Sequence, residues 1–210
     1  MHSFGGWRSV GYGFADVEAA LAEIHGIADE KRSAFSNRLK HLQRLGFPPG
    51  VNTGRGRAAT YYAEHAFLLG VALQLNEISV SPERAIKMIE SSFSPLAGGA
   101  SFAIEKAEPV FCEVPALSLM DLVYGDRLSE HAGLATFDRD FASKKLELML
   151  AVEGPMRWAI FSLSGLITRL SELLADKLRP DGFPDFKSRL LAWASEVGGP
   201  DDVWKGQDFG

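Results

Sequence analysis

Short amphipathic runs broken by glycine, proline or serine fill the first half of the chain, and this spacing limits it to a set of short helices. One run begins at Asp16, places Val17, Leu21 and Ile24 at helical spacing, and ends at Gly26. Glycine readily adopts the left-handed conformation that follows a helix. With 46% hydrophobic residues and no apolar run near the ~20 residues of a membrane span, the 210-residue chain is expected to be globular.

A second, longer helix is predicted from Asp29, whose carboxylate can cap the first amides, to Gly46, which precedes two prolines. Its apolar residues recur at helical spacing and define a buried stripe: Phe35, Leu39 and Leu42. At 100° per residue, the opposite face is polar and basic. That face comprises Ser33, Asn37, Lys40 and Arg44, with Ser36 and Gln43 on its flank.

Positive charge is concentrated in and just after this second helix. Of the 22 Lys and Arg residues in the chain, seven lie between Lys31 and Ala63, where Asp and Glu are absent. The rest of the chain therefore carries 15 basic against 27 acidic residues. A polyanionic partner would relieve the repulsion within such a cluster, although a solvated helix face would give the same pattern.

The segment 51–62 is too rich in glycine for a helix. Its β-branched and aromatic ends favour two short strands joined by a tip that carries Arg55 and Arg57. A helix is predicted after it, with Phe67, Leu68, Val71, Leu75 and Ile78 buried. Ser81 and Pro82 are suited to the cap and first turn of a further helix, whose apolar side comprises Ile86 and Ile89.

Beyond residue 93 the pattern changes. The glycine-containing stretch 94–101 is predicted to be a domain boundary, followed by β-rich runs at 108–125 and 157–164. Helices are expected at 165–178 and 187–197, whereas the apolar spacing of 141–152 fits helix and strand equally. The predicted organisation is α+β: residues 1–95, a domain at 96–180, and a short helix with an acidic tail at 181–210.

The order of elements up to Ser92 resembles the winged helix-turn-helix DNA-binding domain of MerR-type transcriptional regulators. The motif "RLKHLQRLGFPP" is similar to the end of that family's recognition helix, with Lys40 where an arginine is usual and Leu39 as the apolar anchor. "GRGRAATYY" is similar to the wing, and "ISVSPERAIKMIE" matches the following helix in layout. The segment from Gly26 to Leu39 is longer than the family's tight turn, and neither its coiled-coil heptads nor its metal-sensing cysteines are present.

The resemblance implies a sequence-specific transcriptional regulator that binds double-stranded DNA as a homodimer. The second helix would enter the major groove, and the wing would reach the minor groove or backbone. We expect either the helix at 165–178 or the strand at 157–164 to supply the dimer contact. The expected DNA-binding residues are Arg32, Ser33, Ser36, Asn37, Lys40, Gln43, Arg44, Arg55 and Arg57.

Two other classes of function stay open. The same basic surface could dock on an acidic protein, as in an adaptor or antitoxin-like module, or the second half could house a small-molecule enzyme. We find no catalytic motif, no phosphate loop and no histidine pair at metal-binding spacing, so no enzyme, cofactor or metal is expected. His65 is interpreted as an interior residue and the single Cys112 as a buried apolar one. Without a signal peptide, the expected location is the cytoplasm.

Overall fold

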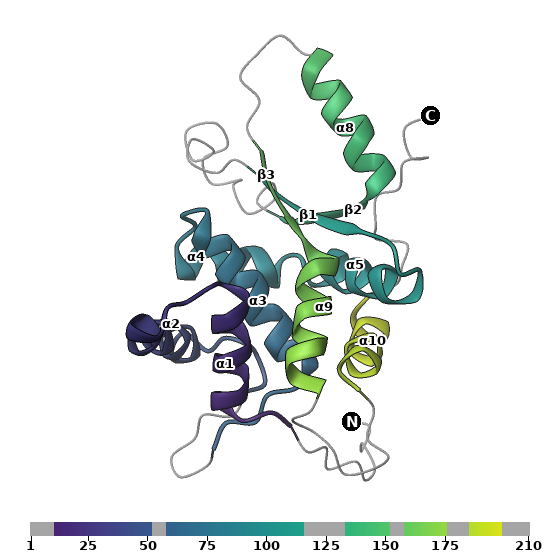
Figure 1. The fold of residues 1–210 in the computed structure, drawn as a ribbon. Coiled ribbons are helices and arrows are strands. Elements are labelled where there is room, and N and C mark those ends of the chain that lie inside the picture. Colours follow the sequence, from purple (N-terminus) through teal and green to yellow (C-terminus); the bar gives the residue numbers. More distant parts are fainter. Residues whose placement is uncertain (1–10, 52–57, 116–132, 152–157, 176–184, 199–210) are drawn as a thin grey trace.

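The structure, a computed structural model, describes residues 11–51, 58–115, 133–151, 158–175 and 185–198. Helices and a small sheet form the architecture shown in Figure 1. In chain order the elements are α1 (Phe14–Ile24), the 3-10 helix η1 (Asp29–Lys31), α2 (Arg32–Arg44), α3 (Ala63–Glu77), α4 (Pro82–Glu90), α5 (Phe93–Glu105), β1 (Val110–Pro115), β2 (Ala135–Asp138), α8 (Arg139–Ala151), β3 (Trp158–Ser162), α9 (Leu163–Leu174) and α10 (Phe186–Val197).

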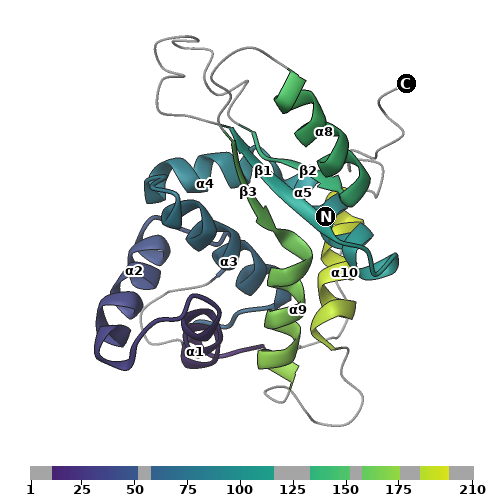
Figure 2. The same ribbon diagram turned by 45° about the horizontal axis from the view of Figure 1, so that its top comes forward.

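The sheet is antiparallel and has the strand order β2-β1-β3. Cys112 in the central strand faces Thr136 on one side and Phe161 on the other. Its side chain is fully buried, as predicted, and burial raises the pKa of its thiol. Figure 2 shows α8 on one side of the sheet and α5 on the other. The mixture of helices with this small sheet confirms the predicted α+β class.

The short helices begin and end largely where the sequence predicts. α1 is followed by Gly26 with φ of 60°, and Ser81 caps α4 by accepting a hydrogen bond from the amide of Arg84 at 3.4 Å. The second helix differs at its start, because Asp29 does not cap it. Residues 29–31 instead form the separate turn η1, and α2 begins at Arg32 without a side-chain cap.

α3 lies at the centre of the helical part, between α4, α9 and α10 (Figure 1). Nearly all of its side chains are buried, since it is apolar around most of its circumference. Ile78 was expected in this buried set but is 43% exposed, because the helix ends at Glu77 and Ile78 follows as its C-cap.

The stretch 94–101, where the sequence predicts a domain boundary, is helical. It lies inside α5, and Leu96, Ala100 and both glycines between them are buried. The glycines serve packing here, since a Cβ on Gly99 would lie 2.9 Å from atoms of Leu163 and Thr136. The stretch from which the domain boundary was predicted therefore contributes to the core.

Elements from both halves of the chain share one hydrophobic core. α10 packs on α3 and α5, and its Trp193 ring lies 6.0 Å from that of Phe67. α9 packs against α1 and α3. The separation into domains at residue 95 stays a prediction, but helices on either side of it are buried against one another.

The two elements expected at a dimer contact differ in exposure. The apolar side of α9 is buried within the chain, including Leu166 and Leu170, because it packs on α1, α3 and α5. This side of α9 is therefore core and is not available to a second copy. β3 has one large exposed apolar residue, Ile160, at 45%. Residues 141–151 of the ambiguous stretch lie in helix α8.

Several predicted features lie outside the described residues. One is the tip of the segment 51–62, which contains Arg55 and Arg57. The others are the part of the β-rich run 108–125 that follows Pro115, and the acidic tail from residue 199. Among the described helices, none combines the length and apolar character that crossing a bilayer requires.

The close approach at Gly99 predicts a measurable packing conflict. Gly99→Ala should lower the free energy of unfolding by about 1–3 kcal/mol, because the new methyl group meets the stiff side chain of Thr136 as well as Leu163. Adding Thr136→Ser removes the clashing Cγ2 and keeps the hydroxyl that donates to the carbonyl oxygen of Pro95 at 2.8 Å. A double-mutant cycle by chemical denaturation should show part of the loss recovered; purely additive effects would contradict this packing.

Candidate functional site

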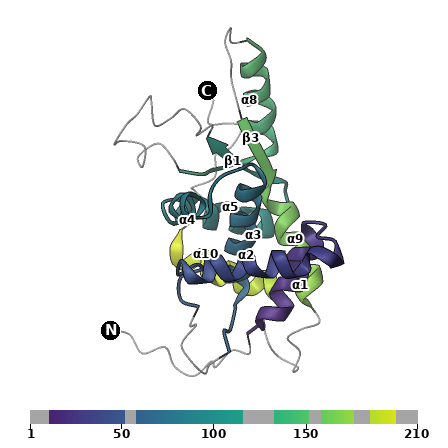
Figure 3. The same cartoon turned by 90° about the vertical axis from the view of Figure 1, so that its left-hand side faces the viewer.

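α2 lies on the outside of the molecule, at the front of Figure 3. Its stripe of Phe35, Leu39 and Leu42 is at most 5% exposed, as the helical spacing predicts. α2 packs beside α1. This burial fixes the rotation of α2 about its axis, so the opposite face is presented to solvent.

The solvent-facing ridge of α2 contains the four residues placed there by the helical spacing. Ser33, Asn37, Lys40 and Arg44 are all exposed. The flanking residues expected to take part in binding are less accessible. These half-buried residues are Arg32, Ser36 and Gln43.

Two contacts fix one flank of α2 against neighbouring elements. The ammonium group of Lys40 lies 5.7 Å from the centre of the Phe14 ring at the start of α1, and Gln43 donates a hydrogen bond to the Tyr61 hydroxyl. Gln43 was expected to reach base edges. Its amide nitrogen is instead engaged within the protein, which indicates a positioning role.

The cations of α2 are not matched by neighbouring carboxylates. Arg32 lies 3.9 Å from Asp29, whose side chain is fully exposed, so this pair is weak. For Arg38, Lys40 and Arg44, no carboxylate lies within ion-pair distance among the described residues. The positive charge that the sequence places on α2 is therefore available at the surface.

The described ends of the segment 51–62 are joined differently from the predicted hairpin. Tyr61 pairs with Tyr12, with backbone hydrogen bonds of 2.8 and 2.9 Å, and not with Val51. Both tyrosines are buried. This pairing ties the chain after the expected wing to the residues that precede α1.

His65 fixes both ends of the same segment. Its Nδ1 accepts a hydrogen bond from the amide of Tyr62 at 3.0 Å, and its ring donates to the backbone carbonyl of Pro49. The ring is 6% exposed, as the interior interpretation predicts, and burial lowers its pKa to about 4. The sequence indicated burial of His65 but not this double attachment, since both partners are loop backbone groups.

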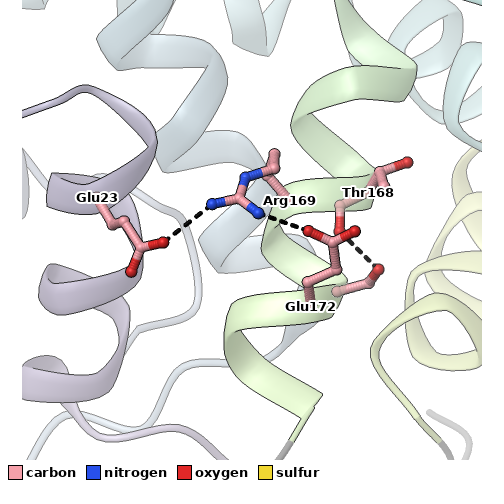
Figure 4. Close-up of polar contacts among 5 residues, drawn as sticks. Glu23, Thr168, Arg169 and Glu172 are labelled. Carbon is pink, nitrogen blue, oxygen red and sulfur yellow. Dashed lines mark hydrogen bonds and ion pairs between the residues drawn. The ribbon is translucent and has the colours of Figure 1, made fainter.

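An exposed ion-pair cluster connects α1 to the second half of the chain. In Figure 4, the guanidinium group of Arg169 on α9 lies between two carboxylates. It is 2.9 Å from Glu23 on α1 and 2.7 Å from Glu172 one turn along α9. The packing of α9 on α1 positions α1, which contacts α2, and the exposed ion pairs add little to that packing.

Polar groups around the sheet are engaged in structural contacts. Glu113 on β1 pairs with Lys145 on α8, and Asp138 accepts a hydrogen bond from the amide of Phe141 at 2.8 Å. Groups of three or more His, Cys, Asp or Glu side chains placed to hold a metal are absent from the described part of the chain. The ridge of α2 therefore remains the strongest candidate site.

A scan against protein-family models finds no match to this chain, and searches of curated proteins and of solved structures find none either.

The buried His65 predicts a pH-dependent stability. Its pKa is about 4 when folded and about 6.5 when unfolded, so only the unfolded chain takes up this proton between those values. The contribution of neutral His65 to the free energy of unfolding is complete above pH 6.5. It should decline by up to about 3 kcal/mol as the pH falls to 4.

Chemical denaturation across this pH range measures the effect. His65→Asn is the matched variant, because it lacks the titrating group. It should be less stable at neutral pH and lose less stability on acidification. Equal pH slopes for the two proteins would show that His65 is not held neutral.

Proposed function

We propose that this chain is a DNA-binding transcriptional regulator with a MerR-like winged helix-turn-helix in its first half, and that α2 is the recognition helix. The observation that supports it most strongly is the exposed ridge of Asn37, Lys40 and Arg44, whose cations have no opposing carboxylate among the described residues. The resemblance in the sequence and the charge of the ridge point to the same helix.

The dimensions of α2 suit the major groove. A helix with its side chains is about 10–12 Å wide and the groove about 12 Å. The 13 residues of α2 extend roughly 20 Å, enough to cross several base pairs. Phe35, Leu39 and Leu42 hold the opposite side of the helix in the core, so the ridge can enter the groove without unfolding.

The exposed side chains suit different contacts. Asn37 is at mid-helix and can form a bidentate pair with adenine, while Lys40 and Arg44 can reach guanine or phosphate oxygens. Ser33, Arg32 and Ser36 lie near the start of the helix and suit phosphates. Arg55 and Arg57 in the expected wing would contact the neighbouring minor groove.

Pairing of two copies would double these contacts and require a site with approximate two-fold symmetry. A single ridge offers few base contacts, so a homodimer supplies the specificity that one copy lacks. The wing and the second copy are both parts of this proposal.

The most informative experiment is selection from a randomised duplex pool, followed by gel shifts at several salt concentrations. For about five phosphates neutralised per protomer, log affinity should fall with log salt at a slope of roughly −4 to −5. Recovery of a defined motif with this slope supports the proposal. Failure to retain any duplex at low salt, or an acidic protein bound in preference to DNA, would contradict it.

Substitutions on the ridge should separate affinity from sequence preference. Arg44→Met should weaken binding to all duplexes and reduce the salt slope by about one, because a cation is lost. Asn37→Ala should relax preference at one base pair, by about 1–3 kcal/mol of discrimination. Lys87→Met, on the exposed side of α4, is the matched control and should bind as the parent does. An unchanged motif for Asn37→Ala would remove it from base recognition.

The wing is tested separately. The double substitution Arg55→Ala with Arg57→Ala should weaken binding to every duplex, most strongly where A·T-rich sequence flanks the motif, since a narrow minor groove has the most negative potential. Gel shifts with flanks of different composition measure this. If the double variant bound DNA with parental affinity, the wing would not be part of the interface. α2 would then make the whole contact.

A further inference from the structure

Two adjoining cavities form a groove along the flank of α2 opposite the Gln43 contact. One cavity, of about 330 Å³, lies between α2, the end of α1 and the end of α3. The other, of about 410 Å³, lies between α2 and the turn that joins α3 to α4. Ala34, Arg38 and Asn76 line both cavities, so the two are continuous at these residues. We refer to them together as the α2 groove.

The first cavity combines an apolar floor with a cationic rim. Ile27, Phe35 and Leu73 supply apolar surface, whereas Lys31 and Arg38 supply positive charge. Small-molecule sites commonly pair a mostly apolar lining with a few polar groups that fix orientation. The shape and chemistry of the groove thus suit a ligand with an apolar body and one charged end.

The charge at the rim favours an anion. The two cations Lys31 and Arg38 outnumber the one carboxylate among the lining residues, Glu77, whose oxygen lies 2.6 Å from Nδ1 of His25. Arg38, by contrast, has no carboxylate within ion-pair distance in the described part of the chain. An incoming carboxylate could accept bidentate hydrogen bonds from its guanidinium group.

Two further polar groups in the groove have unused hydrogen-bonding capacity. The Asn76 amide nitrogen donates to the carbonyl oxygen of Val80 at 2.9 Å, which leaves its amide oxygen to accept from a ligand. The His25 side chain is 3% exposed, and its Nε2 is buried without a hydrogen-bond partner among the described residues. With Nδ1 donating to Glu77, this buried Nε2 is an acceptor that a water or a donor group of a ligand can satisfy.

We propose that the α2 groove binds a small organic acid, with its carboxylate on Arg38 and Lys31 and its apolar body against Ile27, Phe35 and Leu73. The inference depends on the cavity and its chemistry and does not rest on the proposed DNA binding. If one proposal fails, the other is still tested by its own experiment.

Binding can be measured by amide NMR titration of the full chain with benzoate and hexanoate, each compared with its neutral amide. We expect the acids to produce saturable shifts of the backbone amide resonances of Ala34, Arg38 and Asn76. The neutral amide of each acid should produce much weaker shifts. The proposal would be overturned if neither acid produced saturable shifts. It would also be overturned if the acids and their neutral amides bound equally, or if the shifts were confined to another surface.

Two substitutions test the site without altering the core. Arg38→Met should weaken acid binding about tenfold or more, since a charged hydrogen bond is lost, whereas Arg44→Met on the solvent-facing ridge should have no effect. Ala34→Leu should abolish binding by filling the shared part of the groove; Ala34 is exposed, so the helix can accept a larger side chain. Parental affinity in either groove variant, with an unchanged circular dichroism spectrum, would contradict the assignment.

Discussion

Burial of Phe35, Leu39 and Leu42 is the constraint on which the candidate surface depends. These three side chains lie on one side of α2 and are at most 5% exposed, so the helix cannot rotate without exposing them. Loss of that burial would remove about 1.5–3 kcal/mol per large side chain. The same constraint that stabilises the helix therefore fixes Asn37, Lys40 and Arg44 at the surface.

Contacts from distant parts of the chain support this arrangement. His65 joins the two ends of the segment 51–62, Tyr61 pairs with Tyr12, and Arg169 connects α9 to α1 (Figure 4). α10, near the end of the chain, packs against α3 and α5. The candidate surface is therefore supported by a core that includes elements from both halves of the chain. The stability of that core limits how far α2 can move.

Local periodicity predicted most helices and the orientation of α2, because a repeat of 3.6 residues is contained in the helix itself. It could not predict partners distant in sequence, such as Tyr61 for Gln43, and so Gln43 was expected among the DNA-binding residues. The same limit applies to the glycines of 94–101, which predicted a domain boundary and lie inside helix α5. A glycine that permits a close approach to Thr136 looks, in sequence, the same as one that permits a turn. Asp29 fits a cap by type, yet η1 separates it from α2.

Disulfide crosslinking tests the central claim, contact between the α2 ridge and DNA bases, most directly. Cys112 is the single native cysteine and is fully buried, so an Asn37→Cys variant presents one accessible thiol. A duplex recovered from the random pool, with a thiol tether on a base of the motif, would be the partner. The account predicts rapid crosslinking of Asn37→Cys and only background reaction of Lys87→Cys on α4. Equal yields from the two variants, or none from Asn37→Cys, would contradict it.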